Sequence, residues 1–268
     1  MVIPTHRFAA CCCLSIALLA GSTPALGQTT TTPEGLTRTP TVSPVADAAR
    51  PSVADDLFKP LLGDFKQLGS SRNLFLAGLG AGVALSAHPW DKDVARSAWA
   101  DEAHEAFEPG KHIGSFLTQS GAAVVTYAVG RTTGNARVAA LGARLFRAQV
   151  VAQGATQVIK LATHRTRPDG SHLSFPSGHT AAAFATAAVL QDEFGWKAGL
   201  PAFAMAGWVA TSRVQMDRHY LSDVIAGATV GLLAGRSLTV GKGSARFSLT
   251  PMAVPGGIGV AGVRITGR

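Results

Sequence analysis

The sequence predicts an all-α protein, built as a bundle of about six to eight helices. Apolar runs with helical length and spacing recur along the chain, and no long stretch alternates apolar with polar residues before residue 245. Apolar residues make up 47% of the 268 residues, which is enough to build a core. Charged residues make up only 15%, below the roughly 25% of a typical soluble domain, and this favours contact with a membrane.

The segment before the bundle is predicted to direct export. Residues 1–27 have the pattern of a signal peptide, with a short basic start, an apolar run and a small-residue cleavage site at 25–27. An uncleaved membrane anchor is the alternative, although a span requires about 20 apolar residues and this run is shorter. Residues 28–55 are rich in Thr, Pro, Ser and Ala, which predicts a disordered linker. All three cysteines, residues 11–13, lie in the signal peptide, so we expect no disulfide in the exported chain.

Residues 56–240 are predicted to form the helical domain. Residues 56–70 place apolar side chains at helical spacing, and Pro60 is tolerated there only in the first turn. This helix is expected either to lie on a membrane surface or to pack on the core. The uncharged run 113–130 is the best candidate for a membrane span. Further helical runs are expected at 74–87, 135–162, 180–190, 198–211 and 224–235.

Three smaller features accompany these runs. Gly78, Gly80 and Gly82 are expected to allow close packing of helices rather than to bind a dinucleotide, because no strand precedes them. The acidic patch 91–108 is interpreted as the solvated face of a helix. Residues 241–268 alternate apolar with polar side chains on both sides of a Pro-Gly-Gly turn, which predicts an extended tail or a small hairpin.

The net charge of +8 predicts an anionic partner, such as a phosphorylated substrate or an anionic lipid surface. Nucleic acid is not expected, because the chain lacks a basic helix, zinc-ligand spacing and an aromatic platform. No metal or other cofactor is expected either, since no cluster of carboxylates is available to hold one. No pattern in the sequence predicts an oligomeric state.

Two histidine clusters carry the chemistry. His219 and Asp223 are four residues apart, so on a helix they would share one face, and the carboxylate could orient the imidazole as a nucleophile. Ser177 and Gly178 precede an apolar run, which predicts a capped helix start whose amide groups form an anion site. His179 would lie at its mouth, where it could protonate a leaving alkoxide. A surface pair and a structural histidine are the ordinary alternatives.

Three basic residues complete the set. Arg167 and Arg213 carry guanidinium groups, each of which can donate two parallel hydrogen bonds to phosphate oxygens, and Lys160 supplies a point charge. Phosphoryl transfer depends mainly on positioning and on neutralising charge, so converging cations suit it. Other basic neighbours, among them Arg165 and Arg218, are interpreted as charges facing the substrate or as solvated residues.

Together these residues resemble the signature of the type-2 phosphatidic acid phosphatase superfamily, which includes bacterial non-specific acid phosphatases and vanadate-dependent haloperoxidases. The signature runs over residues 160–223, about a quarter of the chain. It reads lysine, six residues, Arg-Pro; then Pro-Ser-Gly-His; then Ser-Arg, five residues, His, three residues, Asp. The interval between Pro168 and Pro176 is shorter than usual, which leaves little room for a long loop over the substrate.

The resemblance implies a helical bundle of the acid phosphatase and vanadium haloperoxidase type. It implies that His219 is the nucleophile that forms a phosphohistidine, that Asp223 orients it, and that His179 is the general acid. Ser212 would position Arg213. The residues implied to hold the phosphate oxygens are Lys160, Arg167, Ser177, Gly178 and Arg213.

The sequence therefore predicts a metal-independent phosphatase that cleaves a phosphomonoester or a pyrophosphate, with a lipid favoured as substrate. We expect it in the periplasm or in the membrane, with its active site on the non-cytoplasmic side. A soluble periplasmic acid phosphatase with the same fold is the first alternative. A haloperoxidase that holds vanadate in the same cradle is the second.

Overall fold

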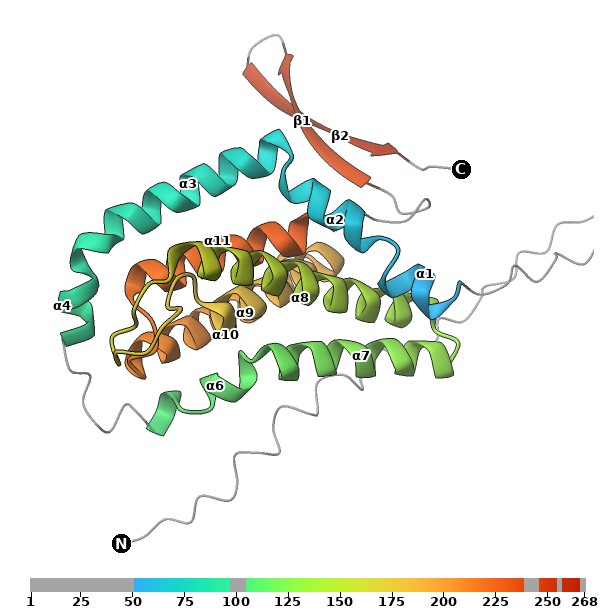
Figure 1. Ribbon diagram of the computed structural model, residues 1–268. Helices are drawn as coiled ribbons and strands as arrows, with labels where there is room; N and C mark the ends of the chain where they lie inside the picture. The colour runs from blue at the N-terminus through green and yellow to red at the C-terminus, as the bar shows by residue number, and fades with distance from the viewer. Residues whose placement is uncertain (1–50, 97–104, 239–245, 255–256, 266–268) are drawn as a thin grey trace, which may run out of the picture. The chain divides into compact units, whose positions relative to one another are not determined.

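The computed structural model describes residues 51–96, 105–238, 246–254 and 257–265, and up to Arg236 the regular elements among them are helices (Figure 1). The all-α prediction is confirmed. Four of the five further helical runs fall within a helix, and the fifth, 135–162, begins one residue before its helix. The signal peptide and nearly all of the predicted linker lie outside the described residues. The helices are α1 (Val53–Leu57), α2 (Leu61–Leu68), α3 (Ser71–Ala87), the 3-10 turn η1 (His88–Trp90), α4 (Asp91–Arg96), α6 (Gly110–Ile113), α7 (Phe116–Thr132), α8 (Ala136–Thr163), α9 (Gly178–Phe194), α10 (Trp196–Gln215) and α11 (Leu221–Arg236).

The predicted helix at 56–70 is two helices, and the first begins inside the predicted linker. The hydroxyl of Ser52 accepts the N–H of Asp55 at 3.2 Å, and the Asp55 carboxylate accepts the N–H of Ser52 at 3.0 Å, which caps α1. Pro60 separates α1 from α2 because it has no N–H and its ring clashes with a preceding helical turn. On α2, the buried Asp64 pairs with Arg147 of α8 at 2.6 Å, so this segment packs on the core.

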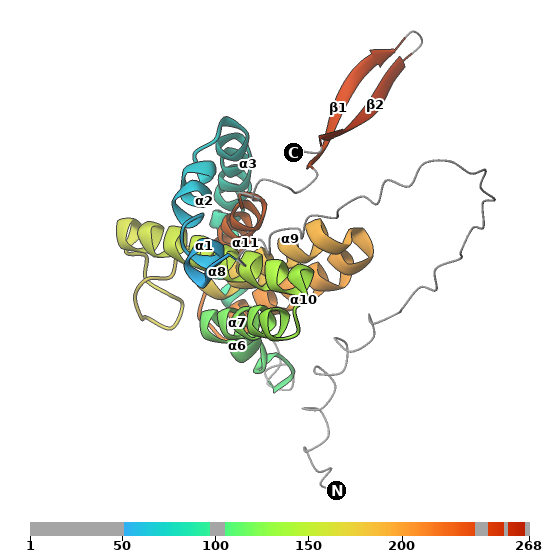
Figure 2. The same cartoon turned by 90° about the vertical axis from the view of Figure 1, so that its right-hand side faces the viewer.

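The core lies where α8, α9 and α11 meet, and its side chains are mostly small. Alanine and valine from these three helices form its largest cluster, which allows the helix axes to approach closely. α7 packs along α8, and α10 packs on α9. α3 lies on the outside, next to α11, in both views of the ribbon (Figures 1 and 2). The long helices therefore bring the C-terminal ends of α8 and α10 and the N-terminal end of α11 near the start of α9.

A row of glycines on α11 permits its contact with α9. Gly227, Gly231 and Gly235 follow one another at four-residue spacing and face backbone carbonyls of α9 and its N-cap. A Cβ atom added at Gly231 would lie 2.3 Å from the carbonyl oxygen of Ala181, closer than any real contact. Because the obstacle is backbone, it cannot move aside as a side-chain end would.

Replacing Gly231 by alanine is therefore expected to destabilise the protein by about 1–3 kcal/mol, as overpacking of a core does. Gly82 of α3 is the matched control, because a Cβ there meets nothing within 4 Å. At that position alanine should stabilise the helix by about 0.5–1 kcal/mol. Denaturant unfolding of both variants measures the two effects, and equal free energies would contradict the packing explanation.

The glycine triplet of α3 behaves as predicted at one position only. A Cβ at Gly80 would lie 2.3 Å from the side chain of Thr229 on α11, so this glycine does allow close packing. Gly78 and Gly82 have no such neighbour within 4 Å. The three lie two residues apart, and helical geometry turns only Gly80 towards α11.

The predicted span at 113–130 is interrupted near its start. α6 ends at Ile113, and α7 begins at Phe116 after Ser115, whose hydroxyl accepts the N–H of Thr118 at 3.0 Å. α7 is 17 residues long. Across the described parts of the chain, no helix combines the length and the apolar character that crossing a bilayer requires.

The tail contains the hairpin that the alternating pattern predicts. β1 (Arg246–Val254) pairs antiparallel with β2 (Gly257–Ile265), from Arg246 opposite Ile265 to Val254 opposite Gly257.

Candidate active site

The predicted site residues come from four places in the bundle. Lys160 is in the last turn of α8, and Arg167 is in the segment that leads from α8 to α9. Ser177 is the N-cap of α9, and Gly178 and His179 are its first residues. The remaining three, near the α10–α11 connection, are Arg213, His219 and Asp223.

The pair of His219 and Asp223 forms, but not as a helical pair. His219 precedes α11, which begins at Leu221 after its N-cap Tyr220, so the predicted shared helix face is wrong. The capping turn nevertheless brings His219 Nδ1 to 3.6 Å from Asp223 Oδ2. That distance is within the range of an ion pair but longer than a hydrogen bond. Both side chains are buried.

Burial sets the protonation of this pair. It lowers the pKa of His219 to about 4, against the opposing pull of Asp223, and the charges of Lys160 and Arg167 lower it further. Burial alone would raise the pKa of Asp223, but the neighbouring His219, the hydrogen bonds from Ser174 and the Tyr220 N–H, and the charge of Arg165 hold it below its usual value. Above about pH 4 the imidazole is therefore neutral beside an ionised carboxylate.

His179 faces the same cluster with a defined tautomer. Its Nε2 lies 3.1 Å from the backbone carbonyl of Lys111 on α6, and a carbonyl only accepts, so Nε2 carries the proton. The neutral ring then has its lone pair on Nδ1. Burial lowers the pKa of His179 to about 4, helped by the charges of Arg213, His219 and Arg167. His179 is therefore close enough to Arg213, His219 and Arg167 for their charges to act on its pKa.

The three predicted cations have no acidic partner within ion-pair distance in the described residues. Lys160 and Arg213 are buried, and the Nε atoms of Arg167 and Arg213 have no hydrogen-bond partner. Burial and the charge of Arg167 lower the pKa of Lys160 to about 8. Burial lowers the pKa of Arg213 to about 10, and Arg218 and Arg167 add to the effect. In the described residues none of the three cations forms an ion pair, although the charge of Asp223 acts on Lys160 and opposes the lowering of its pKa.

The Lys160 ammonium also supports the loop around it. It donates hydrogen bonds to the backbone carbonyls of Leu173 and, at 3.4 Å, of Ser174. Two of its three hydrogens are therefore directed at the backbone, which leaves one for an anion.

Ser177 caps α9, as its position before the apolar run predicts. Its hydroxyl accepts the side-chain O–H of Thr180 at 3.0 Å and the Thr180 N–H at 3.4 Å, and the residue is fully buried. Its own N–H donates to the backbone carbonyl of Asp223 at 2.9 Å, which joins the start of α9 to α11. Gly178 lies against α8, where an added Cβ would be 3.3 Å from Gln153 Oε1. The phosphate-binding roles of both residues stay predictions.

The sequence interpretation was wrong about two charged residues. Arg165 was taken for a substrate-facing or solvated charge, but its guanidinium donates to Asp223 Oδ1 at 2.7 Å and to Asp91 Oδ2 at 2.7 Å. Asp91 was placed on a solvated face, and it is 1% exposed. Both contacts cross between segments far apart in the chain, so no local pattern could reveal them. Arg218 is a partly exposed charge, paired with Asp169 on the neighbouring loop.

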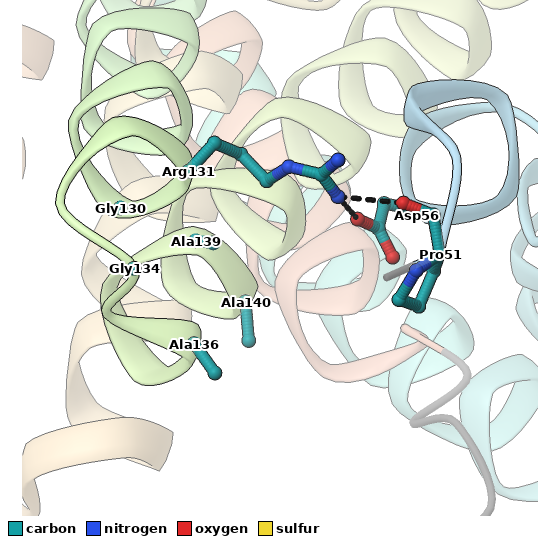
Figure 3. Close-up of a pocket in the computed structure, with 8 residues that line it drawn as sticks. All are labelled: Pro51, Asp56, Gly130, Arg131, Gly134, Ala136, Ala139 and Ala140. Carbon is teal, nitrogen blue, oxygen red and sulfur yellow. Dashed lines mark hydrogen bonds and ion pairs between the residues drawn. The ribbon is translucent and has the colours of Figure 1, made fainter. Parts of the chain in front are cut away.

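A concave region lies at the C-terminal end of α7, between α1 and the α7–α8 turn (Figure 3). Asp56 and Arg131 face one another across it at 3.3 Å, and Tyr127 also donates to Asp56 at 2.9 Å. Arg131 donates as well to the carbonyl of Pro51 at 2.6 Å. Its charged groups are therefore already paired, and none of the predicted site residues lines it.

Comparison with known proteins agrees with the signature. Residues 138–243 match the PAP2 superfamily. This range contains all eight predicted site residues, so the resemblance found from residues 160–223 is confirmed for this part of the chain.

Part of the chain also matches two curated proteins. Lipid A 1-phosphatase of Porphyromonas gingivalis is 43% identical over 75 residues, which are 26% of this chain and 17% of that protein. Lipid A 4'-phosphatase of Helicobacter pylori is 31% identical over 93 residues, which are 30% of this chain and 47% of that protein. The matches thus span less than half the length of these relatives.

One solved structure resembles the chain more broadly. The transmembrane PAP2-type phosphatidylglycerolphosphate phosphatase of Bacillus subtilis aligns with a TM-score of 0.44 and 20% identity, over 66% of this chain and 89% of that one.

Proposed function

We propose that this protein is a metal-independent phosphatase that removes phosphate from a lipid phosphomonoester or pyrophosphate through a phosphohistidine at His219. The observation that carries the proposal is a set of three cations near the two imidazoles, none of which forms an ion pair in the described residues. The charges of Lys160 and Arg167 act on the pKa of His219, and those of Arg213 and Arg167 act on the pKa of His179. The three cations have no acidic partner within ion-pair distance in the described residues, and two guanidinium Nε atoms are unsatisfied. A phosphate group supplies both the charge and the acceptor oxygens that this cluster lacks.

The reaction would proceed in two displacements. The Nε2 lone pair of His219 attacks phosphorus, while the bond between phosphorus and the leaving oxygen breaks and His179 gives that oxygen a proton. Asp223 balances the positive charge that develops on the His219 ring. His179 then removes a proton from water, whose oxygen attacks the phosphohistidine. As this P–O bond forms, the bond between phosphorus and His219 Nε2 breaks, and His179 passes the proton taken from water to the product. Inorganic phosphate then leaves as a monoanion, and both imidazoles are neutral again.

His179 needs a proton that the empty site does not give it, because its pKa is about 4 there. A substrate monoanion can bring this proton. Burial lowers the pKa of His179, and the charges of Arg213 and Arg167 add to this effect. Once bound, the phosphate neutralises these two charges and places its own negative charge beside the ring, so the pKa of His179 rises and the proton moves to the imidazole. A substrate monoanion with a neutral His179 carries the same number of protons as a substrate dianion with a protonated His179, so the reactive complex can form from the monoanion.

The pH dependence of kcat/KM follows from this scheme. We expect a fall as pH drops through about 4, where His219 becomes protonated and loses its nucleophilic lone pair. A second fall is expected as pH rises through about 6, where a phosphate monoester loses its second proton. Profiles from pH 3 to 9 for an alkyl phosphate and for p-nitrophenyl phosphate, whose second pKa is lower, provide the measurement.

The alkaline limb should move to lower pH with p-nitrophenyl phosphate, while the acid limb stays in place. If the alkaline limb is the same for both esters, the substrate does not deliver the proton. An acid limb near pH 6 would show that His219 keeps an ordinary imidazole pKa, contrary to its burial.

A lipid substrate is supported by two observations. The curated proteins that match part of this chain are a lipid A 1-phosphatase and a lipid A 4'-phosphatase. The outer face of α3 also presents uncharged apolar side chains that suit contact with acyl chains or with a membrane. Those that are more than half exposed are Leu74, Phe75, Leu79, Val83 and Leu85.

Cell fractionation combined with two assays tests the proposal. We expect phosphatase activity in the exported fractions, higher on vesicles that contain phosphatidic acid than on p-nitrophenyl phosphate, and unchanged in excess EDTA. A preference for the soluble ester would favour the soluble acid phosphatase alternative. Loss of activity in EDTA, restored by a divalent ion, would refute the metal-independent mechanism.

A further inference from the structure

The guanidinium of Arg165 links two buried carboxylates on different segments. Its Nη1 donates to Asp223 Oδ1 at 2.7 Å and to Ser222 Oγ at 2.7 Å, and its Nη2 donates to Asp91 Oδ2 at 2.7 Å. Its guanidinium carbon lies 4.4 Å from the centre of the Tyr220 ring, which fixes the plane of the group. Arg165 is therefore oriented on three sides.

Asp91 is in turn fixed by the start of α11. Its Oδ1 accepts the N–H of Ser222 at 2.8 Å, and its Oδ2 accepts the Ser222 hydroxyl at 2.6 Å. His88 Nδ1 lies 2.9 Å from Oδ2. The first residue of α4 thus holds both Arg165 and the first turn of α11, the turn that carries Asp223.

These contacts leave Arg165 unsuited to bind phosphate directly. Its charge is shared between Asp91 and Asp223, whereas Lys160, Arg167 and Arg213 have no such partners in the described residues. Its effect on the site must instead pass through Asp223. Asp223 Oδ2 faces His219 and accepts the Ser174 hydroxyl and the Tyr220 N–H, so Arg165 is what holds the other oxygen, Oδ1.

We infer that Arg165, held by Asp91, is a positioning residue that sets the orientation of the Asp223 carboxylate and, through it, of the His219 imidazole. The inference rests on the proposed function, because the orientation of His219 matters only if its ring reacts. Without Arg165, Oδ1 loses its charged donor, and the carboxylate can turn about the two hydrogen bonds that Oδ2 keeps from Ser174 and Tyr220. A misplacement of this kind, about 1 Å at the reacting atom, typically slows an enzyme about 100-fold.

A double-mutant cycle tests whether Arg165 acts through Asp223. We expect Arg165→Ala to lower kcat on vesicles that contain phosphatidic acid about 100-fold, with KM and vanadate inhibition nearly unchanged. In an Asp223→Asn background the same substitution should change kcat less than about threefold, because the group it acts on is already gone. Equal effects in both backgrounds, or a rise in KM alone, would overturn the inference.

Two further variants separate positioning from stability. Arg131→Ala removes a comparable pair, since Arg131 and Arg165 have side chains 29% and 21% exposed and each binds an aspartate. It should lower the melting temperature without changing kcat. Arg165→Lys keeps the charge but has no second donor arm, and should recover only part of the lost kcat. If Arg165→Ala does not fold, Asp91→Asn takes its place in the cycle with the same expected outcomes.

A crystal structure of the Arg165→Ala variant gives a readout that does not depend on activity. We expect the Asp223 carboxylate to turn, so that the separation between His219 Nδ1 and Asp223 Oδ2 differs from 3.6 Å. An unmoved carboxylate would overturn the inference even if the wild-type protein is a phosphatase. A wild-type protein that forms no phosphohistidine would refute the proposed function instead, whatever the variant structure shows.

Discussion

Replacing His219 by alanine is expected to lower kcat by about 10⁴-fold or more while the protein stays folded. The substitution removes the atom that attacks phosphorus, and the remaining cations can bind the substrate but cannot form the covalent intermediate. The fold should survive because Nδ1 of this buried ring makes no hydrogen bond. Removing the ring therefore leaves no neighbouring group without a hydrogen-bond partner that it had before. KM should change little, since Lys160, Arg167 and Arg213 remain.

Rapid-quench labelling with a ³²P-phosphorylated substrate measures the missing step directly. Wild-type protein should retain label that survives alkali and is lost in acid, as phosphohistidine does, and His219→Ala should retain none. His172→Ala is the matched control, because His172 is an exposed histidine on the segment between α8 and α9 and should leave both label and kcat unchanged. Undiminished turnover in His219→Ala would refute the proposed nucleophile.

Replacing Arg213 by methionine is expected to lower kcat/KM about 10³-fold and to stabilise the empty protein. An arginine that neutralises the transferring phosphoryl group contributes at least this much to catalysis. In the absence of phosphate the same residue is a buried charge with no acidic partner in the described residues and an unsatisfied Nε. Its pKa, lowered to about 10 by burial and then by Arg218 and Arg167, shows that folding disfavours the charged form.

Thermal unfolding with and without vanadate separates the two effects. Below pH 10 the Arg213→Met variant should melt higher than wild type, by an amount equivalent to about 1–2 kcal/mol, and vanadate should stabilise it much less. Arg147→Met is the contrasting control, because Arg147 is also buried but pairs with Asp64 at 2.6 Å. Breaking that pair should destabilise by about 3–5 kcal/mol. A lower melting temperature for Arg213→Met would show that its charge is compensated after all.

The helices were predictable because their signals are local. The apolar periodicity of 135–162 and 224–235 depends only on neighbouring residues, and the corresponding helices α8 and α11 contain these runs almost entirely. Where the predicted helix boundaries were wrong, a single residue set the observed boundary. Pro60 separates α1 from α2, and Ser115 starts α7 after a break.

The sequence by itself determined the helical architecture and the identities of the eight residues proposed to do the chemistry, because helical periodicity and motif spacing are properties of the linear chain. Only the tertiary structure decided how those residues are supported. It placed His219 before α11 rather than on it, buried Asp91, and joined Arg165 to Asp223 from 58 positions away. It also left Lys160, Arg167 and Arg213 without acidic partners among the described residues. Burial, pairing and unbalanced charge depend on which distant segments meet, and no local pattern of residues encodes that.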